Sequence, residues 1–346
     1  HLFDLLIEHR LLQHFSSQKK YFPGGLDGKF GQKSDELKQQ SLLQFAELIK
    51  VIKTFNHQNI SIICLKGLLL SHDLFGDFSR RPSKDIYFLI NPIDFKTSVT
   101  LLKGHGYIFD GAVPNTPKQK KAFQKVKHHY NLYHPEKNVH VELHWRILAS
   151  TTHKNWDNEG IWSRARIETH SGIKFKRLSE FDEALYLCIH GTRHLWFRMF
   201  WLHDLTLLLK KKEANWKSEL LNYSKKYGLE NYVLAAFGLI DFCTKKKPPK
   251  PISTSHQAFK LIKLTHEAWN RGDRKQNRDQ KFAFSDYFKF YKMIYYSQGF
   301  KGVLNEYHSR RIKPENWSFF AFPDFVFGLN HFFSRIIWFV RKKAES

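Results

Sequence analysis

The feature that most constrains the fold is a pair of short apolar segments separated by a lysine–glycine turn. The run "ISIIC" (residues 60–64) is short and β-branched, which is typical of a buried strand. It passes through "LKG" into "LLLSHDLFG", which has the pattern of a short helix. The run "DIYFLI" (residues 85–90) then predicts a second strand. This order indicates a sheet with at least one helix packed against it.

The turn at Lys66 and Gly67 has the features of an anion site. Backbone N–H groups at the start of a helix have no partner within the helix, so phosphate oxygens are favoured there. Lys66 adds a positive charge, and Arg81 adds a planar guanidinium that suits bidentate phosphate contacts. Asp85 begins the second strand. Taken singly, each of these residues is also typical of an ordinary surface, but their order favours a phosphate and metal site.

Further elements surround these strands. Residues 35–58 predict an amphipathic helix, because apolar residues recur there at helical spacing. Residues 93–107 predict a helix that ends near Gly104 or Gly106. Residues 127–145 predict a β-hairpin, because two alternating segments flank a short polar turn. Together these segments predict an α+β core built on a small mixed sheet.

The second strand of the hairpin separates two kinds of side chain. Alternation puts Val139, Val141 and Leu143 on one face, and His140, Glu142 and His144 on the other. In a small mixed sheet this strand would lie beside the Asp85 strand, so that two carboxylates could hold Mg²⁺ near the Lys66 turn. The two imidazoles beside Glu142 would also suit Zn²⁺, although such residues are more often only the polar face of a strand.

The chain beyond Trp145 shows no strand pattern and is predicted to be helical. Helical periodicity covers three segments, residues 179–210, 216–227 and 230–243. Clustered lysines and prolines make residues 245–253 the best candidate for a linker. The aromatic segment from Trp317 predicts either a packed helix pair or a weak contact with a membrane surface.

Charge and cysteine content limit the classes of protein to which the chain can belong. Lys and Arg number 56 against 32 acidic residues, and the formal net charge of +24 favours anionic partners such as nucleotides or nucleic acids. Such an excess is equally common as a source of solubility. The three cysteines show no paired spacing, which predicts a reducing, cytoplasmic location. No apolar run approaches about 18 residues, so no transmembrane segment is predicted.

Four ordered motifs resemble one family. The stretch "LKGLLLSHDLFGDFSRRPSKDIYFLI" resembles the "LKG…RPxxDID" segment of a family of largely uncharacterised bacterial nucleotidyltransferases. "HVELHW" is similar to that family's "DLHW"-type strand, and "LCIHGTRHLWFRMFWLHDLTLLL" to its histidine-rich helical segment. "PENWSFFAFP…RIIWFVRK" is similar to its ending. The resemblance runs from about residue 41 to near the end, and it implies the fold of DNA polymerase β-type nucleotidyltransferases.

The same resemblance implies a set of site residues. The family pattern is an Asp-x-Asp pair plus a third acid, which together bind two Mg²⁺ (or Mn²⁺) ions. Asp85 matches the first acid, Glu142 the third, and Lys66 with Gly67 the turn, while Arg81 matches the arginine of the motif. The second acid falls on Tyr87. A phenol with a pKa of about 10 is neutral at neutral pH and is a poor Mg²⁺ ligand, so two-metal chemistry is in question.

Two hypotheses follow for the function. The first is a nucleotidyltransferase that moves a nucleoside monophosphate, with ATP among the candidate donors, from a nucleoside triphosphate to a small molecule, protein or nucleic acid. Residues 1–150 would form the nucleotidyltransferase-like domain. Residues 151–346 would form a helical domain that binds the acceptor, with His144, His190 and His194 as acceptor-site candidates. The second is a catalytically inactive protein that binds a nucleotide or nucleic acid. Tyr87 is compatible with a natural loss of activity, with weaker one-metal chemistry, or with an introduced change.

Overall fold

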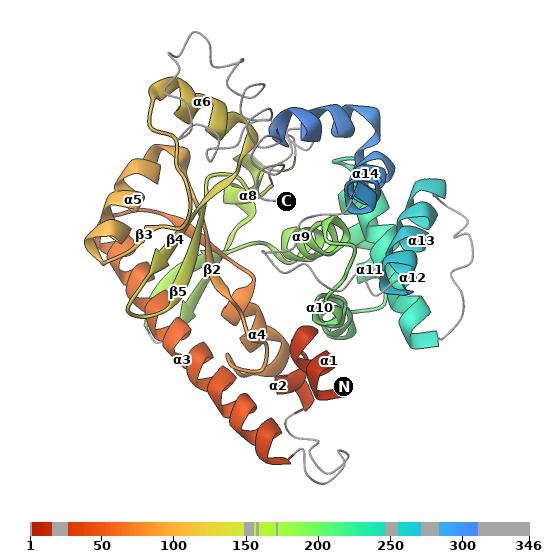
Figure 1. Cartoon of the computed structure of the whole chain (residues 1–346), viewed down its shortest axis with the longest axis horizontal. Coiled ribbons are helices and arrows are strands. Elements are labelled where there is room, and N and C mark those ends of the chain that lie inside the picture. Colours follow the sequence, from red (N-terminus) through yellow and green to blue (C-terminus); the bar gives the residue numbers. More distant parts are fainter. Residues whose placement is uncertain are drawn as a thin grey trace, which may run out of the picture.

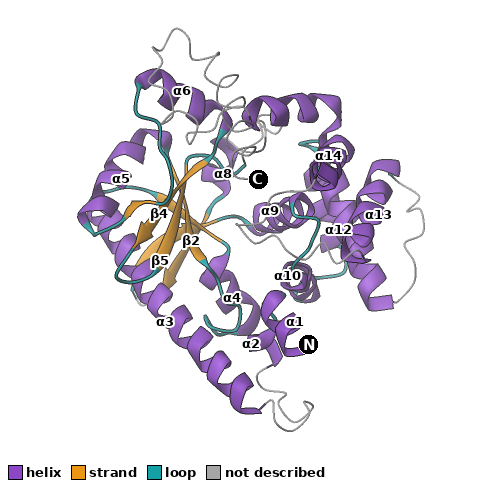
Figure 2. Cartoon of the chain, in the orientation of Figure 1, coloured by secondary structure: helices purple, strands orange, loops and turns teal. Residues whose placement is uncertain are grey.

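A seven-stranded mixed sheet forms the centre of one half of the molecule (Figures 1 and 2). The computed structural model describes residues 2–15, 27–148, 156, 159–170, 172–245, 255–270 and 284–310. The strand order is β3-β4-β5-β2-β1-β7-β6. The strands are β1 (Ile62–Leu65), β2 (Asp85–Ile90), β3 (Ile108–Phe109), β4 (His129–His134), β5 (Val139–His144), β6 (Arg166–His170) and β7 (Ile173–Arg177).

Helices occupy both sides of this sheet and all of the other half (Figure 1). In the first part of the chain they are α1 (Leu2–Glu8), α2 (Leu12–Phe15), α3 (Asp27–His57), α4 (Gly67–Phe75), α5 (Phe95–Gly104) and α6 (Pro117–Val126). The later helices are α8 (Glu159–Arg164), α9 (Glu180–Arg193), α10 (Met199–Lys210), α11 (Trp216–Lys225), α12 (Glu230–Lys245), α13 (His256–Asn270) and α14 (Phe284–Arg310). The α+β fold class predicted from the sequence is therefore confirmed.

Two hydrophobic clusters cover the two faces of the sheet. On β1, Ile62 and Cys64 pack against α3 and α5, whereas Ile63 and Leu65 pack against the helices that follow the sheet in sequence. The alternation arises because successive side chains of a strand point to opposite faces. One face of the sheet is thus closed by helices of the first half, and the other faces the helical half of the molecule.

The predicted hairpin is confirmed, since β4 and β5 pair antiparallel. The expectation that strands end at Trp145 was wrong, because β6 and β7 form a second hairpin and β7 joins β1 in parallel. This hairpin lies at the edge of the sheet, and the Ile167 side chain of its outer strand is 69% exposed. An edge strand buries little apolar surface, so its sequence lacks the apolar pattern that marked the central strands.

The continuous helix expected at residues 179–210 was also wrong. The chain forms α9 and α10, with Leu195 and Trp196 between them at φ values of 47° and 49°. Trp196 is fully buried, and a Cβ placed on Gly191 would clash with its ring. Tertiary packing of this indole therefore breaks a segment that has no proline to signal the break.

Some predictions concern residues that the structure does not describe. Apart from Lys245, the expected linker at 245–253 lies outside the described residues, and so does the aromatic segment from Trp317. The division into residues 1–150 and 151–346 stays a prediction. Among the helices of the described ranges, none has the length and apolar character needed to cross a membrane.

Candidate functional site

The predicted site residues of the sheet lie on the face that looks toward the helical half. Strands β2 and β5 pair in parallel, with Asp85 opposite His140 and Tyr87 opposite Glu142. Val139, Val141 and Leu143 pack into the core on the other face. Because the pattern alternates, Asp85, Tyr87 and Glu142 share one face, as the sequence predicted. Asp85 and Glu142 are diagonal neighbours on adjacent strands.

Tyr87 binds Asp85 directly. Its hydroxyl donates a hydrogen bond to Asp85 Oδ2 at 2.9 Å. Burial, followed by the charges of Glu142 and Asp85, raises the pKa of Tyr87 well above its ordinary value, so the phenol is a neutral donor. Burial and the Glu142 charge also raise the pKa of Asp85. Two carboxylates thus lie close together in a desolvated place, where a cation is favoured.

Lys66 supplies one positive charge beside this carboxylate pair. It is 7% exposed, and its Nζ lies 4.1 Å from the centre of the Tyr87 ring and 3.5 Å from His190 Nδ1. Burial lowers its pKa to about 8, although Glu142 acts in the opposite direction. Gly67 follows with φ of 63° and begins α4. A small pocket touches Lys66, Gly67, Asp85 and Tyr87.

Glu142 is held as a carboxylate. His144 Nε2 donates a hydrogen bond to Glu142 Oε2 at 3.1 Å, and His129 Nε2 lies 3.9 Å from the same oxygen. Burial alone would raise the pKa of Glu142, but the hydrogen bond from His144 and the nearby positive charges lower it to about 2. Glu142 is therefore ionised at neutral pH and is a weak base.

Arg81 connects the Lys66 turn to the helical half. Its Nε donates to Asp204 Oδ2 of α10 at 2.6 Å, and its Nη1 donates to the Gly67 carbonyl at 3.4 Å. The guanidinium also lies 4.8 Å from the Phe200 ring. Arg81 is thus close to the turn, and its Nε is held by a buried carboxylate of the helical half.

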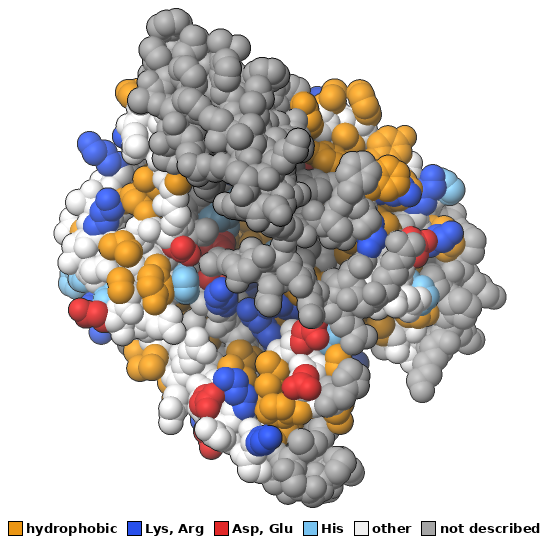
Figure 3. Space-filling view, viewed as in Figure 1, with side chains coloured by type: hydrophobic (Ala, Val, Ile, Leu, Met, Phe, Trp, Pro, Cys, Tyr) orange, Lys and Arg blue, Asp and Glu red, His pale blue; other side chains and the backbone are white. Residues whose placement is uncertain are grey.

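Arg10 and Arg198 were missed by the sequence reasoning. Arg10 lies in the turn after α1 with φ of 54°, and Arg198 precedes α10. Burial chiefly lowers the pKa of each, whereas Tyr87 and Asp85 raise it, which places both arginines within electrostatic reach of the carboxylate pair. The Nε of Arg198 is buried and has no hydrogen-bond partner among the described residues. Figure 3 shows Lys and Arg side chains gathered near the middle of the face that it displays, beside acidic ones.

The predicted acceptor-site histidines also come to this region. The rings of His190 and His194 lie 4.8 Å apart, and both pack on Trp201. Burial lowers the pKa of His190 well below its ordinary value and that of His194 to about 3, so both are neutral. By contrast, His140 lies 3.5 Å from Asp110 and does not join Glu142 and His144, as the Zn²⁺ alternative would have required.

The donor set fits one hard cation better than two. Asp85 and Glu142 supply carboxylate oxygens, which Mg²⁺ prefers, and burial together with the Glu142 charge raises the pKa of Asp85, so a bound cation would stabilise its ionised form. Tyr87 contributes a neutral hydroxyl where a third carboxylate would complete a two-metal set. The residues present therefore suit a single Mg²⁺ or Mn²⁺ ion that keeps several of its waters.

Comparison with known protein families places the site in a family. A family model described as an uncharacterised nucleotidyltransferase matches residues 1–243, a range that contains every site residue named above. No curated protein matches the chain.

Proposed function

The chain belongs to the uncharacterised nucleotidyltransferase family, and from this premise we propose that it transfers a nucleoside monophosphate from a nucleoside triphosphate to an acceptor. The observation that carries the proposal is the meeting of Asp85 and Glu142 on adjacent parallel strands, directly beside the Lys66–Gly67 turn that begins α4. Carboxylates for a metal ion and cations for phosphates are the parts that this chemistry needs.

Each charged residue has a role in the proposal. Asp85 and Glu142 would hold one Mg²⁺ ion, which when bound would neutralise phosphate charge and polarise the reacting phosphorus centre. Lys66, together with Arg10 and Arg198, would bind the triphosphate, while Arg81 would hold the turn and add to the positive field. Because these side chains are buried or half-buried, their charges interact more strongly with phosphate than they would in water.

The acceptor side is formed by the neutral imidazoles. His190 lies 3.5 Å from Lys66 Nζ with His194 beside it, and both would contact the acceptor without adding charge. Because the pKa of Glu142 is about 2, we assign this residue to orienting the metal ion and the nucleophile, and not to accepting a proton. The proposal covers a small molecule, a protein or a nucleic acid as the acceptor.

Release of pyrophosphate tests the proposal. The full chain is incubated with each of the four ribonucleoside triphosphates, Mg²⁺ or Mn²⁺, and candidate acceptors. We expect metal-dependent pyrophosphate from at least one triphosphate, and its loss in Asp85→Asn and Glu142→Gln. Glu213→Gln is the matched control, because it removes a carboxyl group that is exposed and lies in the turn between α10 and α11. A fully active Asp85→Asn variant would reject this site.

The phenol of Tyr87 at the position of the second acid supports a second candidate function, that of a nucleotide-binding protein without catalytic activity. In this alternative the phenol, hydrogen-bonded to Asp85, replaces a metal ligand permanently. Nucleotide binding would then raise the melting temperature without any pyrophosphate release. For a nucleic-acid partner the affinity would fall steeply with salt, whereas a small-molecule acceptor would show a shallow dependence.

A further inference from the structure

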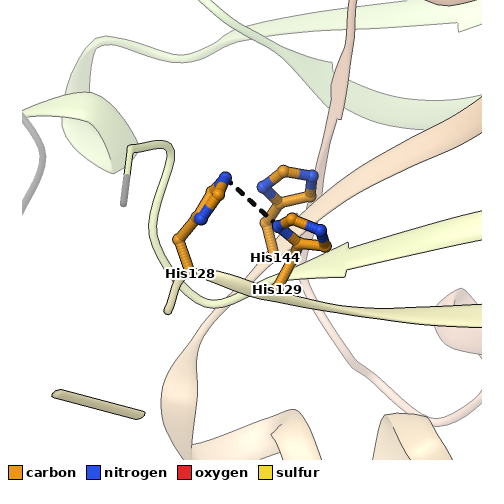
Figure 4. Close-up of side chains that lie close together, drawn as sticks. All are labelled: His128, His129 and His144. Carbon is orange, nitrogen blue, oxygen red and sulfur yellow. Dashed lines mark hydrogen bonds between the residues drawn. The ribbon is translucent and has the colours of Figure 1, made fainter. Parts of the chain in front are cut away.

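Three histidines form a compact cluster beside Glu142 but away from Asp85. His128 and His129 lie at the start of β4, and antiparallel pairing puts His129 opposite His144 at the end of β5. One ring nitrogen from each histidine lies within 4.8 Å of the other two, and His129 Nδ1 is 3.1 Å from His128 Nε2. Figure 4 shows the three rings gathered around a common centre.

We propose that His128, His129 and His144 bind one Zn²⁺ ion, at a second metal site that borders the carboxylate site at Glu142. Zn²⁺ binds imidazole nitrogen at about 2.0–2.1 Å in tetrahedral geometry, and three histidines with a fourth, open position are a frequent arrangement. Mg²⁺ prefers oxygen donors, so the two sites would select different ions. This inference does not rest on the proposed nucleotidyl transfer.

Glu142 is the hydrogen-bond partner of His144, one of the three proposed zinc ligands. It accepts the hydrogen bond from His144 Nε2, while His144 Nδ1 is buried and has no hydrogen-bond partner within the described part of the chain. His128 Nδ1 is buried and unpaired in the same way. A carboxylate that holds one ring nitrogen while the other binds metal is the usual setting of a zinc-bound histidine. Zn²⁺ at His144 Nδ1 would supply the missing partner and fix the orientation of Glu142.

Direct metal binding tests the site. The full chain is stripped of metal with a chelator and titrated with Zn²⁺ in competition with a chromophoric chelator; Co²⁺ is then used as a spectroscopic probe. We expect one Zn²⁺ per chain and the visible absorption bands of tetrahedral Co²⁺. Glu142→Gln should weaken Zn²⁺ binding about 10–100-fold, because it removes the partner of a ligand. His128→Asn and His129→Asn should weaken it more, since each removes a ligand.

Two variants separate this site from its neighbours. His140→Asn alters a histidine on the same strand that faces Asp110, and Asp85→Asn alters the carboxylate site; both should keep full Zn²⁺ affinity. The His128 and His129 variants carry the test because these side chains are partly exposed, whereas replacing the buried His144 endangers the fold. Absence of stoichiometric Zn²⁺ binding, or binding unchanged in both of these variants, would overturn the proposal and leave a hydrogen-bonded histidine cluster.

Discussion

At the scale of single residues, Tyr87 sets the state of the carboxylate site. Its hydroxyl satisfies one oxygen of Asp85, and its ring lies under the Lys66 ammonium, 4.1 Å from Nζ. A metal ligand would have given the site a negative charge, whereas the phenol gives it a neutral donor and an aromatic face. One oxygen of Asp85 thus has a hydrogen-bond partner without an ion. A metal ion that binds this oxygen must displace the Tyr87 hydroxyl.

Replacing Tyr87 with aspartate is expected to strengthen Mg²⁺ binding. The change adds a carboxylate next to Asp85 and Glu142 and removes the competing hydrogen bond, so we expect affinity to rise roughly tenfold or more. Isothermal titration calorimetry measures it directly. Without Mg²⁺ the variant should melt lower than the natural sequence, because three carboxylates then repel one another.

Tyr87→Phe is the control for this change. It removes the same hydrogen bond and keeps the ring under Lys66, but it adds no ligand. Its Mg²⁺ affinity should rise only by the share that comes from the lost hydrogen bond, and therefore by less than that of the aspartate variant. Equal affinity in the aspartate and phenylalanine variants would show that position 87 does not contact the ion.

Lys66 should make nucleotide binding depend on pH. Its pKa is lowered to about 8, chiefly by burial, so in the free protein it loses its proton as pH rises through about 8. A bound triphosphate favours the charged form of Lys66 and so raises its pKa. Affinity for the triphosphate should therefore be highest below about pH 8 and fall above it. The total fall should be roughly tenfold for each unit by which the pKa of Lys66 differs between the free and the bound protein. Binding of a non-hydrolysable triphosphate at about pH 7 and about pH 9 measures the effect.

Lys66→Arg provides the comparison for that experiment. An arginine keeps its charge throughout this range, so the variant should lose most of the pH dependence. A natural protein whose affinity is as flat as that of the arginine variant would contradict a phosphate-binding role for Lys66.

At the scale of elements, the turn between β1 and α4 depends on two successive residues with positive φ. Lys66 has φ of 35° and Gly67 has φ of 63°. A glycine adopts this region freely, whereas a lysine does so at a cost. The turn places the Lys66 side chain against Tyr87 and exposes the start of α4 to the carboxylate pair. Strain at this position is therefore coupled to the geometry of the site.

Gly67→Ala tests the turn. The nearest atom to an added Cβ would be Ser83 Oγ at 3.6 Å, which is ordinary contact, so the cost comes from the backbone conformation. We expect a loss of about 1–2 kcal/mol in the free energy of unfolding, measured by urea denaturation, together with weaker nucleotide binding. Gly104→Ala, in α5 with open space around it, should be neutral or stabilising by up to about 1 kcal/mol. Similar effects in both variants would exclude a special role for the turn.

The elements differ in how far their sequences predicted them. β2 and β5 were predictable because each alternates between a core face and a site face, which also brought Asp85 and Glu142 together. The edge hairpin β6–β7 was not, since Ile167 of β6 stays exposed, and the alternation of Ile173 and Phe175 in β7 is confined to a strand of five residues. Arg10 and Arg198 carried no local signal either: their nearness to Asp85 exists only after α1 and α10 have packed beside the sheet.

At the scale of the whole molecule, the buried ion pair between Arg81 and Asp204 helps to join the sheet half to the helical half. Arg81 lies in the loop before β2, and Asp204 lies in α10; their side chains are 5% and 1% exposed. Hydrophobic packing of Ile63, Leu65 and Leu89 against the later helices joins the same two halves. The candidate site lies on this shared face, so the relative position of the halves sets its geometry (Figure 1).

The ion pair should leave a signature in the dependence of stability on pH. Burial raises the pKa of Asp204 from 3.8 to about 6, and Arg81 only partly offsets this effect. Between about pH 4 and about pH 6 the folded state therefore binds more protons than the unfolded state, so this group makes the free energy of unfolding fall as pH rises. Above about pH 6 both states are ionised, and its contribution no longer changes.

In Asp204→Asn the side chain at this position cannot titrate, so its free energy of unfolding lacks this fall with pH. Loss of the ion pair lowers the stability of the variant by an amount that does not depend on pH. The free energy of unfolding of the variant minus that of the natural sequence should therefore increase by roughly 3 kcal/mol between about pH 4 and about pH 7, measured by denaturant unfolding. Glu213→Gln, which removes an exposed carboxyl group, is the control and should show little such change. A difference that stays constant for Asp204→Asn would mean that Arg81 keeps the buried carboxylate ionised throughout, so that the two halves are joined by a full ion pair even in acid.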